Sequence, residues 1–228
     1  MMQKTLLLIL LASPLLLEAQ SADELLARVR ARLEKVSDYQ ASGKMKTNVA
    51  FVKAPIATVK VFYKRPNKLR INNESGFSLI PKGSFNINVG NIFLSSGDFD
   101  VIDMGLEQKT GLRVIKLLPR DDESDVVLST LHVDPRLAVV RKARVTTREN
   151  GTYELELSYG RYVDYGLADK VIFSFNTKDY KLPKGVVFDY DGGQKKNENK
   201  LPANRKGRVE IQYSSYLINK GIPDSVFL

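Results

Sequence analysis

The stretch Thr152-Tyr153-Glu154-Leu155-Glu156-Leu157-Ser158-Tyr159 decides the fold, because apolar and polar side chains alternate along it. Successive side chains of a β-strand point to opposite faces, so this strand has one apolar and one charged face. Asn150-Gly151 stands directly before it and suits the positive φ angles of a tight hairpin turn. The strand-like run Val139 to Thr147 precedes that turn. The region therefore predicts a β-hairpin with one dry face.

The same alternation recurs on both sides of this hairpin. It is found in Val59 to Lys64, Leu69 to Ile71, Phe85 to Val89, Val126 to Val133, Val171 to Phe175, Val186 to Tyr190 and Val209 to Tyr213. Sequential strands with short polar turns predict a large antiparallel sheet with one dry face. The fold class expected is mainly β, with an α+β character from one helix.

The helix is expected at Ala22 to Val36. Ser21 and Glu24 have the spacing of a capping box. Leu25, Val29, Leu33 and Val36 then form one apolar stripe that must pack on another element.

Two segments interrupt the strand pattern. Gly90 to Leu106 mixes apolar residues with aspartates and glycines, and fits either short lid helices or a further strand. We favour a lid that closes over the sheet. Asp191 to Arg208 is rich in Gly, Asn, Lys and Gln, and is expected to be a mobile surface loop.

The N-terminus has the parts of a secretory signal peptide. Lys4 precedes an apolar run from Leu6 to Leu17 that is too short to span a bilayer, and small Ala19 follows. We expect cleavage after residue 19 and export of residues 20–228 as one soluble periplasmic domain. The chain has no cysteine, which excludes disulfides, thiolate chemistry and a lipid-carrying cysteine at the cleavage site.

The formal net charge of +9 favours anionic partners such as membrane headgroups or acidic lipids. Export makes nucleic acid an improbable partner, and we expect a monomer. One histidine, His132, stands in mid-strand, so Ser-His and multi-histidine zinc sites cannot be assembled. The acidic run 121–125 lacks the ligand spacing of a calcium loop and is predicted to be a hairpin turn. We therefore expect a binding protein without catalytic residues, metal or cofactor.

Several motifs resemble the LolA family of periplasmic carriers of outer-membrane lipoproteins. Residues 24–42 are similar to its opening helix and first strand, and Lys64-Arg65-Pro66-Asn67 is similar to its Lys-Arg-Pro hairpin. Val145 to Gly151 resembles a late hairpin, and Pro183-Lys184-Gly185-Val186 resembles its Pro-x-Gly-Val segment. The resemblance spans most of the chain, but the family's tryptophan-containing strand is not recognisable, and a strand near 208–217 is extra.

The resemblance implies an open, incomplete antiparallel β-barrel around the N-terminal helix and short plug or lid helices, with an apolar cavity for acyl chains. The family's lid-closing arginine corresponds to Arg65. Candidate wall residues are Tyr63, Leu155, Leu157, Phe173, Phe175 and Phe188. The cargo implied is a lipoprotein or another lipid, moved toward the outer membrane with membrane-bound donor and acceptor proteins as possible partners. A periplasmic regulatory sensor and a structural or adhesive surface protein are the alternatives for the same shape.

Overall fold

The computed structural model describes residues 21–49, 52–53, 56–66, 68–73, 98–149, 151–176 and 206–227. The signal-peptide prediction, the strands expected at 85–89 and 186–190, and most of the loop predicted at 191–208 lie outside these residues. The elements are α1 (Ala22–Glu34), β1 (Asp38–Val49), β2 (Val52–Lys53), β3 (Ala57–Lys64), β4 (Lys68–Asn73), β5 (Phe99–Leu106), β6 (Arg113–Pro119), β7 (Val126–Asp134), β8 (Val139–Thr147), β9 (Gly151–Ser158), η2 (Val163–Tyr165), β10 (Lys170–Asn176), β11 (Lys206–Ile218) and η3 (Asp224–Phe227).

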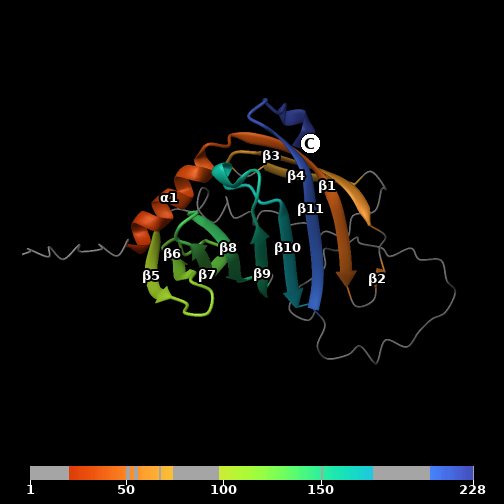
Figure 1. Ribbon diagram of the computed structural model, residues 1–228. Coiled ribbons are helices and arrows are strands. Elements are labelled where there is room, and N and C mark those ends of the chain that lie inside the picture. The colour runs from red at the N-terminus through yellow and green to blue at the C-terminus, as the bar shows by residue number, and fades with distance from the viewer. Residues whose placement is uncertain are drawn as a thin grey trace, which may run out of the picture.

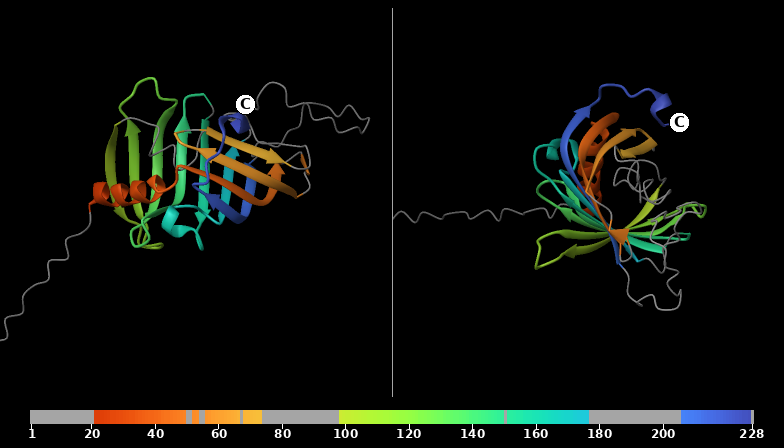
Figure 2. Two further views of the ribbon diagram at one scale, coloured as in Figure 1. Left: turned by 90° about the horizontal axis from the view of Figure 1, so that it is seen from above. Right: turned by 90° about the vertical axis from the view of Figure 1, so that its right-hand side faces the viewer.

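The strands form one antiparallel sheet in the order β4-β3-β1-β11-β10-β9-β8-β7-β6-β5, with β2 paired to β1 (Figure 1). Seen end-on, the sheet curls around an interior (Figure 2). Among the described strands no ladder joins β4 to β5, so the two ends of the sheet do not close. The predicted mainly-β fold, an open and incomplete barrel around an N-terminal helix, is confirmed.

Helix α1 begins as its sequence predicts. The Ser21 hydroxyl accepts a hydrogen bond from the Glu24 backbone N–H at 3.1 Å, and the Glu24 carboxylate accepts one from the Ser21 N–H at 3.1 Å. This capping box satisfies two N–H groups that a helix start otherwise leaves unpaired. The helix ends at Glu34, two residues earlier than expected, because Lys35 caps it and Val36 instead turns into the core.

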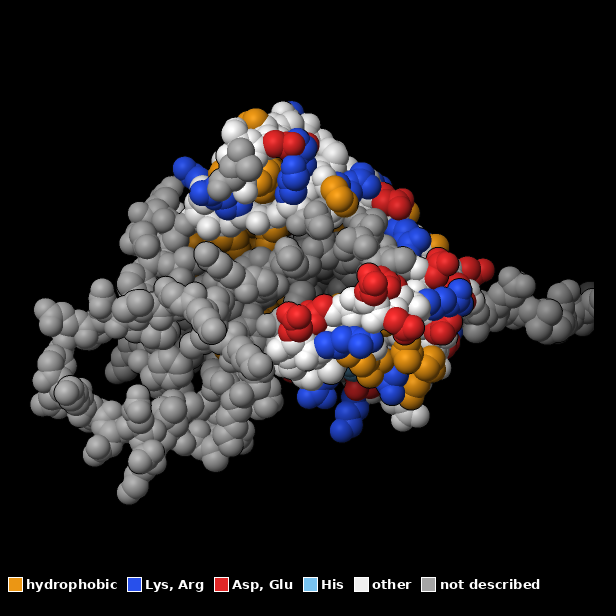
Figure 3. Space-filling model, turned by 180° about the vertical axis from the view of Figure 1, so that it is seen from behind, with side chains coloured by type: hydrophobic (Ala, Val, Ile, Leu, Met, Phe, Trp, Pro, Cys, Tyr) orange, Lys and Arg blue, Asp and Glu red, His pale blue; other side chains and the backbone are white. Residues whose placement is uncertain are grey.

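The lid predicted for 90–106 is wrong where the structure describes it. Residues 99–106 form β5, an edge strand paired with β6. Ile102, Met104 and Leu106 are all exposed on it. A group of apolar side chains is visible at this end of the molecule in Figure 3. The further strand that we considered as the alternative is therefore the structure found there.

Strand β11 lies in the middle of the sheet, between β1 and β10. It pairs with β1 from Tyr39 opposite Ile218 to Asn48 opposite Arg208. The C-terminal segment thus links the N-terminal strands β1, β3 and β4 to the strands β5 to β10. Pairing of such distant segments makes the sheet dependent on both ends of the described chain.

Candidate functional site

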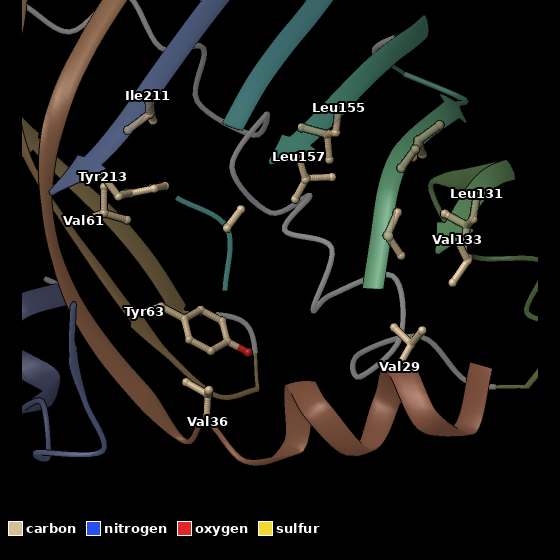
Figure 4. Close-up of a cluster of buried hydrophobic side chains, with 14 of the residues drawn as sticks. Val29, Val36, Val61, Tyr63, Leu131, Val133, Leu155, Leu157, Ile211 and Tyr213 are labelled. Atoms are coloured by element: carbon tan, nitrogen blue, oxygen red, sulfur yellow. The ribbon is translucent and has the colours of Figure 1, made fainter. Parts of the chain in front are cut away.

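The inner face of the curved sheet is apolar over most of its width, and it carries an ion pair of Arg113 and Asp103 at the β5–β6 edge. The register places Ile115, Leu131, Ala143, Leu155, Phe173 and Val209 in one row across six strands. The two neighbouring rows include Leu117, Val145, Tyr153 and Phe175 on one side, and Leu157, Val171, Ile211 and Met45 on the other. Side chains from strands far apart in the sheet converge on the same interior (Figure 4).

Five of the six predicted wall residues lie on this inner face, and the sixth, Phe188, lies outside the described residues. Tyr63, Leu155, Leu157 and Phe175 are buried in the hydrophobic core, and half-buried Phe173 packs against it. The ring centroids of Phe173 and Phe175 lie 5.3 Å apart, and that of Tyr153 lies 5.4 Å from Phe173. Whether these residues contact a ligand stays a prediction.

The absence of a side chain at Gly207 leaves room for the ring of Phe175. Gly207 of β11 lies opposite Phe175, and a Cβ built on it would stand 2.3 Å from the tip of that ring. No heavy atoms approach so closely without displacement, so the ring covers the strand only because residue 207 lacks a side chain. The aromatic wall therefore continues over the backbone of β11.

A cluster of tyrosines, which sequence reasoning had not grouped, forms the other end of the inner face. Tyr39 stacks on Tyr63 with centroids 5.2 Å apart, and its ring lies 5.3 Å from Tyr216. Tyr213 and Tyr162 also contact Tyr216, at 5.1 and 4.8 Å. Burial raises the pKa of Tyr39 and Tyr216 well above that of a free phenol. The rings of the cluster form an apolar surface with a few polar hydroxyl tips.

Two tyrosine hydroxyls donate hydrogen bonds to backbone carbonyls of neighbouring segments. The Tyr216 hydroxyl donates to the Ala168 carbonyl at 2.7 Å, after η2, and the Tyr159 hydroxyl donates to the Val140 carbonyl at 2.9 Å. By contrast, the Ser129 hydroxyl is buried in the inner face with no hydrogen-bond partner among the described residues. The wall is thus apolar, with isolated hydroxyl groups.

Helix α1 runs across one end of the sheet and is tied to the turn after β7 and to η2. Arg28 donates to the carbonyls of Pro135 and Arg136 in the turn after β7, each at 3.2 Å. Arg32 donates to the Val163 carbonyl at 3.1 Å and to the Asp164 carboxylate at 2.9 Å. The apolar stripe of α1 meanwhile packs inward through Leu25 and Val29. The helix therefore covers this end of the interior.

Arg65, in the turn between β3 and β4, also forms a hydrogen bond with α1. Its guanidinium donates to the Glu34 carbonyl at 2.7 Å, at the last residue of α1. Cations are favoured beside the unpaired carbonyls of a helix C-terminus. The partner is the N-terminal helix, and the role of Arg65 in closing a lid stays a prediction.

The polar residues singled out in the sequence lie away from the inner face. His132 is in mid-strand on β7, faces outward, and has its Nδ1 3.8 Å from Glu107. The acidic run 121–125 forms the β6–β7 turn, as predicted, where Asp121 accepts from the backbone of Glu123 and Ser124. Among the described residues no group of three His, Asp or Glu side chains is arranged to hold a metal ion. None of the helices described there combines the length and apolar character needed to cross a bilayer.

The fold is shared with solved structures, one of which is described as a LolA superfamily protein. A domain described as an outer-membrane lipoprotein-sorting domain from Vibrio parahaemolyticus superposes with a TM-score of 0.55 and 14% identity, over 90% of this chain and 94% of that one. A LolA superfamily protein from Nitrosomonas europaea gives 0.52 and 11%, over 91% and 97%. A DUF1329 family protein from Desulfovibrio piger gives 0.53 and 12%, over 90% and 95%.

At these identities the likeness concerns the fold. No protein-family model matches the sequence, and no curated protein matches it.

Proposed function

We propose that this chain, which has a LolA-like fold, is a periplasmic carrier that binds acylated cargo on the inner face of its open sheet. The observation that carries the proposal is the largely apolar inner face of a sheet whose two end strands are joined by no ladder among the described residues. The lipoprotein-sorting description of a structural neighbour supports the same class of cargo. The cargo is a lipoprotein or a lipid, moved toward the outer membrane.

Elementary energetics suit this role. Burying one methylene of an acyl chain contributes about 0.8 kcal/mol, so one long chain supplies on the order of 10 kcal/mol. No catalytic group is required for binding of this kind, because transfer of apolar surface out of water supplies the driving force. Within the proposal, Tyr63, Leu155, Leu157, Phe173 and Phe175 provide the wall, Phe188 extends it, and Arg65 holds α1 over one end.

The first test is mass spectrometry of ligands extracted from protein purified from its native envelope, together with uptake of a fluorescent fatty acid. We expect a lipid or acylated peptide in the extract and saturable uptake by the emptied protein. Absence of both would contradict the carrier function. Capture of an inner-membrane regulator in place of acylated cargo would favour a sensor.

A matched pair of variants locates the site. Phe173→Asp puts a charge on the half-buried inner wall, whereas Ser174→Asp puts the same charge on the outer face of the same strand, opposite Arg208. We expect at least a tenfold loss of fatty-acid affinity for Phe173→Asp and less than a twofold change for Ser174→Asp. Phe173→Leu keeps the wall apolar and should retain binding, which separates loss of the site from loss of the fold.

A further inference from the structure

The outer face of the sheet carries very different charge in its two halves. We define the basic face as the outward-facing side chains of residues 40–48 of β1, 58–62 of β3, 70–72 of β4 and 208–217 of β11. Its charged members are Lys44, Lys46, Lys60, Arg70, Arg208 and Glu210, which are five cations and one carboxylate.

The outer face of β5 to β9 is balanced. Its outward charged side chains on the strands are Asp100, Lys116, Lys142, Arg144, Glu154 and Glu156. Glu154 lies 3.6 Å from Lys142 and 3.2 Å from Arg144, so positive charge is compensated locally. The charge excess of the described sheet is therefore concentrated on the basic face.

The one carboxylate of the basic face, Glu210, is already paired with two cations. Glu210 lies 2.7 Å from Lys170 of β10 and 3.7 Å from Arg208. The hydrogen bond from Lys170 holds the pKa of Glu210 below its usual value. In the ladder, Lys44 lies opposite Thr58 and Gln212, and Lys60 opposite Ser42 and Asn72. Positive charge thus dominates the field in front of these strands.

Exposed apolar side chains stand beside this charge. Leu217 of β11, which lies opposite Gln40 of β1, is 54% exposed. Ile56, directly before β3, is 64% exposed. Phe62 lies half-buried opposite Gln40 on the same face. Basic side chains with isolated apolar ones among them are typical of protein surfaces that lie on a bilayer.

We propose that the basic face docks on the surface of a membrane that contains anionic phospholipids. Three of its cations are lysines, whose ammonium groups act as point charges on flexible stems and need no bidentate partner. The charges are spread over four strands, and the apolar side chains stand at separate places and form no central core. Protein interfaces instead depend on a packed central cluster, with aromatic and arginine side chains prominent.

Docking by this face leaves the inner face free. Inward and outward side chains alternate along the same strands, so membrane binding and cargo binding use opposite surfaces. The inference goes beyond the carrier function: an empty protein and one loaded with fatty acid should both bind vesicles. Failure of membrane docking and failure of cargo binding are therefore separately observable.

The test is co-sedimentation of the protein purified from cells with vesicles of phosphatidylglycerol and phosphatidylcholine in equal parts. A basic side chain near an anionic surface strengthens binding about fivefold, so Lys44→Gln with Lys46→Gln should weaken it about 25-fold. Lys116→Gln with Lys142→Gln lowers the net charge equally on the balanced half and should change binding less than threefold. Binding should also fall as salt is raised.

Three results would overturn the proposal: no binding to the anionic vesicles at low salt, equal binding to pure phosphatidylcholine, or equal weakening by both variant pairs. Thermal unfolding of each double variant is measured as a control and should show that the fold is retained. Binding to soluble polyglutamate without binding to anionic vesicles would assign the basic face to an acidic protein and contradict docking on lipid.

Discussion

The inner and outer faces of this sheet are built by the same strands, yet they follow different rules. The inner face is largely apolar from β3 to β7 and continuous through the central strand β11, with the ion pair of Arg113 and Asp103 at its β5–β6 edge. The outer face is divided into a basic half and a balanced half. A buried face must satisfy packing everywhere, whereas an exposed face can vary in charge at little cost to stability. We therefore expect the proposed cargo binding on the inner face to depend on many residues, and the proposed docking on the outer face to depend on a few local charges.

The largest expected difference between the faces comes from a core truncation. Leu131 on β7 has no exposed surface, whereas neighbouring Thr130 faces outward. Leu131→Ala should lower the free energy of unfolding by about 2–5 kcal/mol through lost burial and a cavity. Thr130→Ala should change it by less than about 0.5 kcal/mol. Urea unfolding measures both, and equal costs would show that the inner face is not the packed one.

A second prediction concerns the pairing of β1 with β11. At Gly43, beside a β-bulge, a Cβ would stand 2.6 Å from the backbone carbonyl oxygen of Gln212. Because backbone cannot swing aside, Gly43→Ala should destabilise the protein by about 1–3 kcal/mol. Ser42→Ala, on the outer face of the same bulge, is the control and should be nearly neutral. A stable Gly43→Ala protein would mean that β1 and β11 approach each other less closely at Gly43 than described.

A third prediction concerns the helix that covers the inner face. Arg65→Ala removes the hydrogen bond to the Glu34 carbonyl and should cost about 1 kcal/mol. Hydrogen exchange of the last turn of α1 should become faster as that end loosens. Arg30→Ala, at an exposed position of the same helix, provides the comparison. Unchanged exchange in the Arg65 variant would remove this residue from any role in holding α1.

The smallest effect is expected on the outer face, at Glu210. Because its pKa is lowered by Lys170 in the folded state, its contribution is present above the ordinary glutamate pKa of about 4.3. The contribution is lost as pH falls through the lowered folded value. The pair is partly exposed, so less than about 1 kcal/mol is at stake. Unfolding from pH 7 to 3 should show a slightly shallower pH dependence for Glu210→Gln, and an identical profile would assign the pair no role in stability.

Local alternation predicted most of the described sheet. The hairpin of β8 and β9 lies where the Asn150-Gly151 turn and the period-two pattern place it. The strands β3, β4, β7, β10 and β11 also occupy the predicted segments. Strand β5 was missed as the favoured structure because a bulge beyond Asp103 and exposed Met104 and Leu106 break the alternation.

Non-local features of the site could not be deduced in this way. Nothing in residues 206–218 indicates that they pair with β1, because pairing of distant strands depends on the whole sheet. The tyrosine cluster joins Tyr39, Tyr63, Tyr162, Tyr213 and Tyr216 from four separate segments. Tyr63 and Tyr213 lay in quoted strand segments beside apolar neighbours, and that signal indicated burial without indicating partners.

The central claim, that acyl chains bind on the inner face, is tested most directly by photo-crosslinking with a fatty acid that carries a diazirine on its chain. Peptide mapping after irradiation should find the label on inward residues such as Leu155, Leu157 and Phe173. Excess unlabelled fatty acid should suppress that label. Labelling confined to outward residues of the same strands, such as Glu156 and Ser174, or labelling that excess fatty acid leaves unchanged, would contradict the account.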